Sequence, residues 1–69
     1  MSKWQKVFSD RQEYRAEIVR AVLEDKGLNP VLISKQDSSI HNWGYFEVHV
    51  EPFNVLSALQ IIKNDIKFG

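Results

Sequence analysis

Residues 45–51, which read YFEVHVE, decide the predicted fold because they form the cleanest strand pattern in the chain. Their apolar members, Phe46, Val48 and Val50, alternate with other residues, and this period of two is typical of a β-strand with one buried face. The intervening side chains are expected to face water: Tyr45, Glu47, His49 and Glu51. The rest of the chain must therefore cover one face of this strand.

The segments on either side of this strand predict a hairpin and a helix. Residues 28–36 form a second strand, and Pro30 indicates a sheet edge because proline cannot donate to the hydrogen-bond ladder. The polar residues 37–44 connect the two strands as a loop. Pro52 opens a helix, a position where its missing N–H costs little. Apolar residues recur at helical spacing and predict one stripe along this helix: Val55, Ala58, Leu59, Ile62 and Ile66, with Leu56 and Ile61 beside it.

The first part of the chain predicts a strand followed by a helix. Residues 3–8 are rich in β-prone side chains. Two overlapping capping boxes start at Ser9 and Asp10, so a helix is expected over residues 10–26. Gly27 then fits the left-handed position that follows a helix end. The apolar stripe of this helix is Ala16, Val19, Val22 and Leu23.

The resulting element order is βαββα, and it predicts a single α+β domain over residues 1–69. A right-handed crossover makes the first two strands parallel. The third strand pairs between them and antiparallel to both, which gives the strand order 1-3-2. Both helices are expected on one face of the sheet, as in a ferredoxin-like domain that lacks its last strand. The outer edge of the first strand and the second face of the sheet are then uncovered.

Composition narrows the classes of protein that fit this chain. Its 69 residues carry nine basic and nine acidic side chains, whereas proteins that neutralise phosphates usually carry a basic excess. The absence of cysteine excludes disulfides and zinc–thiolate sites. No apolar run approaches the ~20 residues of a membrane span, and the cytoplasm is the expected location. A domain this small often depends on a partner subunit, so self-association is expected.

The uncovered sheet face is the predicted interaction surface. The helix-covered side favours Val7, which leaves Trp4 and Phe8 exposed. Tyr45 is expected beside them. In the alternative interpretation, one or two of these aromatic residues fold over a sheet edge and cap the core. Trp43 has the same two alternatives, an interface residue or a cap over the end of the hairpin.

Motifs along nearly the whole chain carry a family resemblance: Lys6-Val7-Phe8, Glu17, Leu23-Glu24-x-x-Gly27-Leu28, Gly44-x-x-Glu47-Val48-x-Val50 and Ala58-Leu59-x-Ile61-Ile62. With them the chain resembles a family of very short bacterial proteins labelled prokaryotic signal-transducing proteins, whose biochemical function is unknown. The resemblance implies a ferredoxin-like fold akin to the nitrogen-regulatory PII proteins, and a fold does not fix a function. It implies no catalytic position. Residues 37–43 contain no Lys or Arg, unlike the nucleotide-binding parts of PII proteins.

The residues that could carry chemistry form no complete site. Glu47 and His49 share a strand face and His41 lies in the adjoining loop, which offers a metal at most three ligands with poorly constrained geometry. The serines near His41 are typical of turn chemistry. The chain has no cysteine nucleophile and no GxSxG elbow, and three glycines are too few for a phosphate-binding loop. We therefore expect no catalytic residue, no metal and no cofactor.

A non-enzymatic binding module is the predicted function, acting through protein–protein contact or self-association. The predicted surface has six residues: Trp4, Phe8, His41, Trp43, Tyr45 and His49. The edge of the first strand is expected to pair with its symmetry mate in a homodimer or with a partner strand.

Two alternative functions remain open. One is a nucleotide or metabolite sensor with a pocket between the sheet and residues 37–43. The other is single-stranded RNA binding by aromatic residues of the uncovered face. RNA binding is disfavoured by the zero net charge and by Glu47, which stands where a stacking aromatic residue is required.

Overall fold

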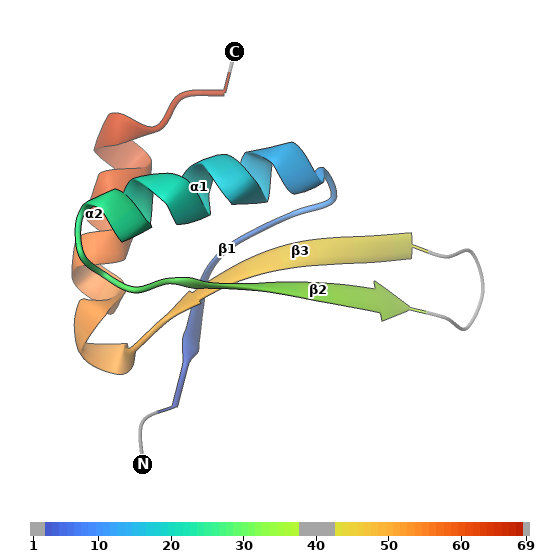
Figure 1. Cartoon of the computed structure of the whole chain (residues 1–69), viewed down its shortest axis with the longest axis horizontal. Helices are drawn as coiled ribbons and strands as arrows, with labels where there is room; N and C mark the ends of the chain where they lie inside the picture. Colours follow the sequence, from blue (N-terminus) through green and yellow to red (C-terminus); the bar gives the residue numbers. More distant parts are fainter. Residues whose placement is uncertain (1–2, 38–42, 69) are drawn as a thin grey trace.

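The structure of the chain is a computed structural model that describes residues 3–37 and 43–68 (Figure 1). The elements are β1 (Gln5–Asp10), α1 (Glu13–Asp25), β2 (Val31–Asp37), β3 (Trp43–Val50), the 3₁₀ turn η1 (Pro52–Asn54) and α2 (Val55–Asp65). This order confirms the predicted α+β class. β1 lies two residues later in the chain than expected, and β3 starts two residues earlier.

The middle strand of the sheet is β3, which pairs antiparallel with both β1 and β2 in the order β1-β3-β2. The predicted strand order is confirmed, and β2 lies at an edge as Pro30 indicated. Val48 stands opposite Phe8 of β1 and Leu32 of β2, so these three side chains share one face. Because Val48 is fully buried, this face is the one that packs on the helices.

The core fills the space between that face and the two helices. Its fully buried members come from three elements: Ala16, Val19 and Leu23 of α1, Val48 and Val50 of β3, and Ala58 of α2. A fully buried Val or Leu side chain stabilises the folded state by about 1.5–3 kcal/mol. The Cα positions span 37 × 36 × 15 Å. The domain is therefore a thin slab with one small core.

The C-terminal end of α1 confirms the role predicted for Gly27. Its φ of 84° is left-handed, and its N–H donates to the carbonyl of Glu24 at 2.9 Å. The next N–H, that of Leu28, donates to the carbonyl of Leu23 at 3.1 Å. This pair of bonds is the Schellman arrangement, which requires a left-handed residue that glycine provides without a Cβ penalty.

The N-terminal end of α1 differs from the prediction. The helix begins at Glu13, because β1 continues through Ser9 and Asp10. The N-cap residue is Gln12, whose side chain makes no capping hydrogen bond; its N–H donates instead to Asp10 Oδ1 at 2.8 Å. The predicted capping boxes are wrong because pairing of β1 with β3 holds Ser9 and Asp10 in the strand, and Asp10 closes a turn that redirects the chain.

A β-bulge in β1 decides which way its aromatic side chain points. The register shifts between Lys6, which stands opposite His49, and Phe8, which stands opposite Val48. A bulge inserts one residue and interrupts the alternation of faces, so Lys6 and Phe8 lie on opposite faces. Phe8 is partly buried against the core, and its ring centroid lies 5.7 Å from that of Phe68. The prediction that Phe8 is exposed on the uncovered face is therefore wrong.

Local backbone chemistry explains two other differences. β2 begins at Val31 because Asn29 is left-handed, with a φ of 51°, and Pro30 has no N–H to pair. Pro52 opens the 3₁₀ turn η1, and the α-helix follows only from Val55.

Candidate functional site

The sheet face opposite the core carries a polar centre, and we call it the open face. Three residues of β3 form its middle row, flanked by residues of β1 and β2. Its members are Tyr45, Glu47 and His49 of β3, Lys6 and Ser9 of β1, and Val31, Ile33 and Lys35 of β2. The buried residues of α1 and α2 all belong to the core on the other side. The described helices therefore leave the open face uncovered (Figure 1).

Glu47 lies at the centre of the open face and is only 9% exposed. Its carboxylate lies 3.8 Å from Lys6 Nζ and 3.7 Å from Lys35 Nζ, one lysine from each outer strand, and 2.9 Å from His49 Nε2. Glu47 and His49 point away from the helices as predicted, but their side chains are mostly covered, whereas the prediction had them facing water. Both belong to the middle strand, where side chains of two neighbouring strands cover them laterally.

The electrostatics of this centre are internally balanced. The hydrogen bond from His49 lowers the pKa of Glu47 below its ordinary value. Burial acts in the opposite direction and raises this pKa, whereas the positive charges of Lys35 and Lys6 lower it further. Because an ionised carboxylate only accepts, His49 donates to it from Nε2, and Nδ1 is its other ring nitrogen. That Nδ1 atom is buried without a hydrogen-bond partner among the described residues. Glu47 is thus paired within the centre, while the exposed parts of Lys6 and Lys35 and the rim are accessible to another molecule.

The rim of the open face is apolar and aromatic. Val31 is 40% exposed, Tyr45 is 42% exposed, and Trp4, just before β1, is 42% exposed. The guanidinium of Arg11 lies 5.8 Å from the centroid of the Tyr45 ring, within cation–π range. Exposed Tyr and Trp side chains are enriched in surfaces that contact proteins.

The residues of the predicted surface do not all meet on this face. Trp4 and Tyr45 are exposed as predicted, and His49 lies on the open face but is mostly covered. Phe8 lies on the opposite face. His41 falls outside the described residues, and for Trp43 only the backbone, at the start of β3, is described. The lysine–glutamate cluster was missed because it depends on the pairing register of three strands.

A second surface without cover lies on α2. Phe53 and Leu56 are each 78% exposed, and Leu59 is 44% exposed. The prediction that Leu59 belongs to the buried stripe is wrong, because α2 fully buries only Ala58 among its own residues. We call Phe53, Leu56 and Leu59 the α2 stripe. Leu56 and Leu59 are three residues apart and lie on one side of α2, and Phe53 lies in the turn η1 directly before the helix.

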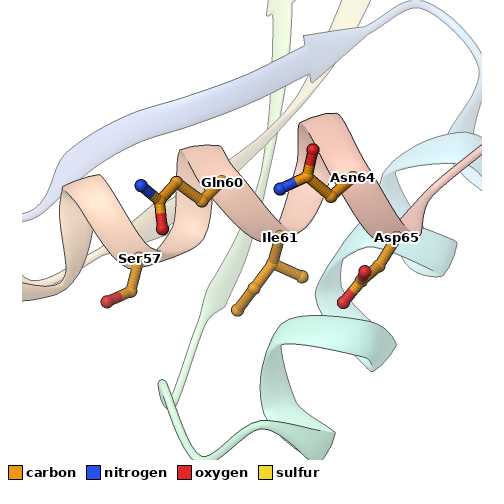
Figure 2. A pocket seen from close by; sticks show the side chains of 5 residues that line it. All are labelled: Ser57, Gln60, Ile61, Asn64 and Asp65. Atoms are coloured by element: carbon orange, nitrogen blue, oxygen red, sulfur yellow. The ribbon is translucent and has the colours of Figure 1, made fainter.

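Hollows on the described surface include two that do not resemble an enclosed ligand pocket. One, of about 290 Å³, is lined by Ser57, Gln60, Ile61, Asn64 and Asp65 of α2 (Figure 2). The other, of about 400 Å³, is lined by Arg20, Ala21, Glu24 and Asp25 of α1. Each hollow is formed by one helix alone, whereas ligand pockets usually enclose most of a ligand between several elements. The pocket predicted beside residues 37–43 lies partly outside the described residues.

The part of the chain that the structure describes contains no group of three or more His, Asp and Glu side chains placed to hold a metal ion. No helix within residues 3–37 and 43–68 is long and apolar enough to cross a membrane.

Comparison of the chain with family models, with curated proteins and with solved structures finds no significant match.

Proposed function

We propose that this chain is a non-enzymatic protein-binding module that holds a partner on its open face. One observation carries the proposal: a whole sheet face is left uncovered by the described helices and carries the exposed Val31 and Tyr45, with the exposed Trp4 directly before β1. Exposed aromatic and aliphatic side chains on an uncovered sheet face are candidates for contact with another protein. A ferredoxin-like relationship and the family resemblance to small signal-transducing proteins form part of this proposal, and both agree with a binding role.

The charge on the open face indicates the chemistry of the partner. Lys6 and Lys35 against Glu47 leave an excess of one positive charge among these three side chains. Both lysine side chains are more than half exposed. A protein segment that presents carboxylates among apolar side chains would complement this arrangement. Nucleic acid fits less well, because the carboxylate of Glu47 stands where bases would stack.

The edge of β1 is the weaker of the two surfaces predicted for partner contact. The bulge between Lys6 and Phe8 breaks the regular spacing of the edge, and bulges protect natural edge strands from pairing. The open face therefore takes precedence over edge pairing in the proposal.

The test is capture of cytosolic proteins on the immobilised chain, followed by mass spectrometry and direct titration of each protein found. Tyr45→Ala removes a rim side chain of the open face. Tyr14→Ala is the matched control, since Tyr14 is 54% exposed on α1. A partner that binds the parent and Tyr14→Ala but loses at least tenfold in affinity with Tyr45→Ala supports the proposal. A partner that binds all three equally contradicts it.

Two further measurements separate the alternative functions. A thermal-shift screen of nucleotides and metabolites tests the sensor hypothesis, because a ligand that binds only the folded state raises its melting temperature. Fluorescence anisotropy with mixed single-stranded RNA at low salt tests the RNA hypothesis. Binding that is lost with both Trp4→Ala and Tyr45→Ala would replace the protein partner with RNA on the same face.

A further inference from the structure

We propose that a second copy of this chain covers the α2 stripe, with the two α2 helices crossing antiparallel about a two-fold axis between Leu56 and Leu59. This dimer is independent of the proposed function, because α2 packs on the core side of the sheet and the open face lies on the other. In such a dimer both open faces remain accessible.

Exposure of the α2 stripe is the first step of the argument. Phe53, in η1, and Leu56 are the most exposed large apolar side chains among the described residues, and Leu59 lies one turn after Leu56 on the same side of α2. The inner side of α2 is already used, with Ala58 fully buried and Val55 and Ile62 packed against the core. The outward row therefore contributes little to the fold of one copy.

Charge complementarity identifies the occupant as a second copy. Glu51 precedes η1 at one end of the stripe, and Lys63 lies one turn beyond Leu59 at the other end. Neither forms an ion pair among the residues described in the structure. An antiparallel two-fold axis brings Lys63 of each copy toward Glu51 of the other. Each of these side chains then gains the ion-pair partner that it lacks within its own copy.

The exposed area of the α2 stripe sets the expected strength of the dimer. The exposed parts of its three side chains amount to roughly 400 Å², on a scale of about 200 Å² for a large apolar side chain. Stable interfaces bury about 800 Å² per partner, so polar neighbours such as Gln60 must complete the contact. The result is a weak dimer that depends on concentration. A small core without disulfides gains stability from even a weak partner copy.

Sedimentation of the whole chain between about 10 µM and about 1 mM tests the dimer, a range suited to weak interfaces. The parent is expected to pass from monomer to dimer over this range. Leu56→Glu is expected to stay monomeric at every concentration, with circular dichroism showing that it remains folded. The matched control is Ile18→Glu on α1, where the side chain is 41% exposed, and it is expected to dimerise like the parent.

The charge pair gives a second, independent readout of the crossing geometry. Glu51→Lys is expected to raise the dimer dissociation constant several-fold, and the double variant with Lys63→Glu is expected to restore it. A parent that is monomeric at about 1 mM, or a dimer that Leu56→Glu leaves intact, overturns the proposal. Capture of a partner by the Leu56→Glu variant separates the two proposals. A variant that no longer dimerises is still expected to bind a partner on its open face.

Discussion

The Nε2 atom of His49 lies 2.9 Å from Oε1 of Glu47, on a sheet face that the described helices leave uncovered. The contact joins two residues of the middle strand that point to the same side. Flanking strands bring Lys6 and Lys35 to the same carboxylate. Glu47 thus ties the three strands together on the side away from the core, and its removal is the most direct test of this arrangement.

Glu47→Gln is expected to destabilise the fold by about 1 kcal/mol, because the two lysines lose their charge partner while the amide keeps part of the hydrogen bonding. The measurement is the free energy of unfolding in urea. Glu24→Gln is the matched control, since Glu24 forms an exposed ion pair with Arg20 on α1. Exposed pairs contribute about 0–1 kcal/mol at most. Equal losses of unfolding free energy in both variants would show that the sheet cluster stabilises the fold no more than an exposed ion pair does.

The same carboxylate gives an expected dependence on pH. Its pKa is lowered in the folded state from an ordinary value of 4.5, so the unfolded chain binds the proton more readily. The stabilisation is fully present above the unfolded pKa and is lost as pH falls through the folded pKa. The difference in unfolding free energy between the parent and Glu47→Gln should therefore be constant near neutral pH and shrink in acid. A difference that persists unchanged at pH ~2 would contradict the assignment.

Leu23→Ala is expected to cost about 2–5 kcal/mol, since Leu23 is fully buried between α1 and the sheet and its truncation leaves a cavity. The control is the same substitution at Leu56, which is 78% exposed. Urea unfolding at protein concentrations too low for self-association is expected to show a change below about 0.5 kcal/mol for the control. A large loss in the control would mean that Leu56 supports the fold of a single copy.

Gly27→Ala is expected to destabilise the chain by about 1–2 kcal/mol, because an L side chain is strained at its φ of 84°. An added Cβ meets nothing within 4 Å, so the cost comes from the backbone alone. Asn29→Gly is the paired control at the other left-handed residue and is expected to be neutral within about 0.5 kcal/mol. Thermal unfolding of both variants checks this. A neutral Gly27→Ala would show that the Schellman end contributes little.

Several elements of the fold followed from local sequence. The alternation of Phe46, Val48 and Val50 predicted the middle strand and its buried face, and Gly27 predicted the end of α1. Pro30 predicted an edge strand. Each of these features depends on the chemistry of one residue or on a period along one segment. Such patterns lie within one segment and do not depend on its contacts with the rest of the chain.

The candidate sites depended on relations between segments. The bulge in β1 turned Phe8 toward the core, and the register of three strands brought Lys6 and Lys35 to Glu47. The position of α2 left Leu59 half-exposed although its spacing fitted the buried stripe.

The sequence by itself determined the βαββα order, the strand character and buried face of residues 45–50 and the end of α1, because periodicity and backbone preference act within a few residues. Only the tertiary structure decided which side chains cover Glu47, which face receives Phe8 and which side of α2 is left bare. Lateral neighbours in a sheet and the docking position of a helix are contacts between distant segments, and local patterns do not encode them.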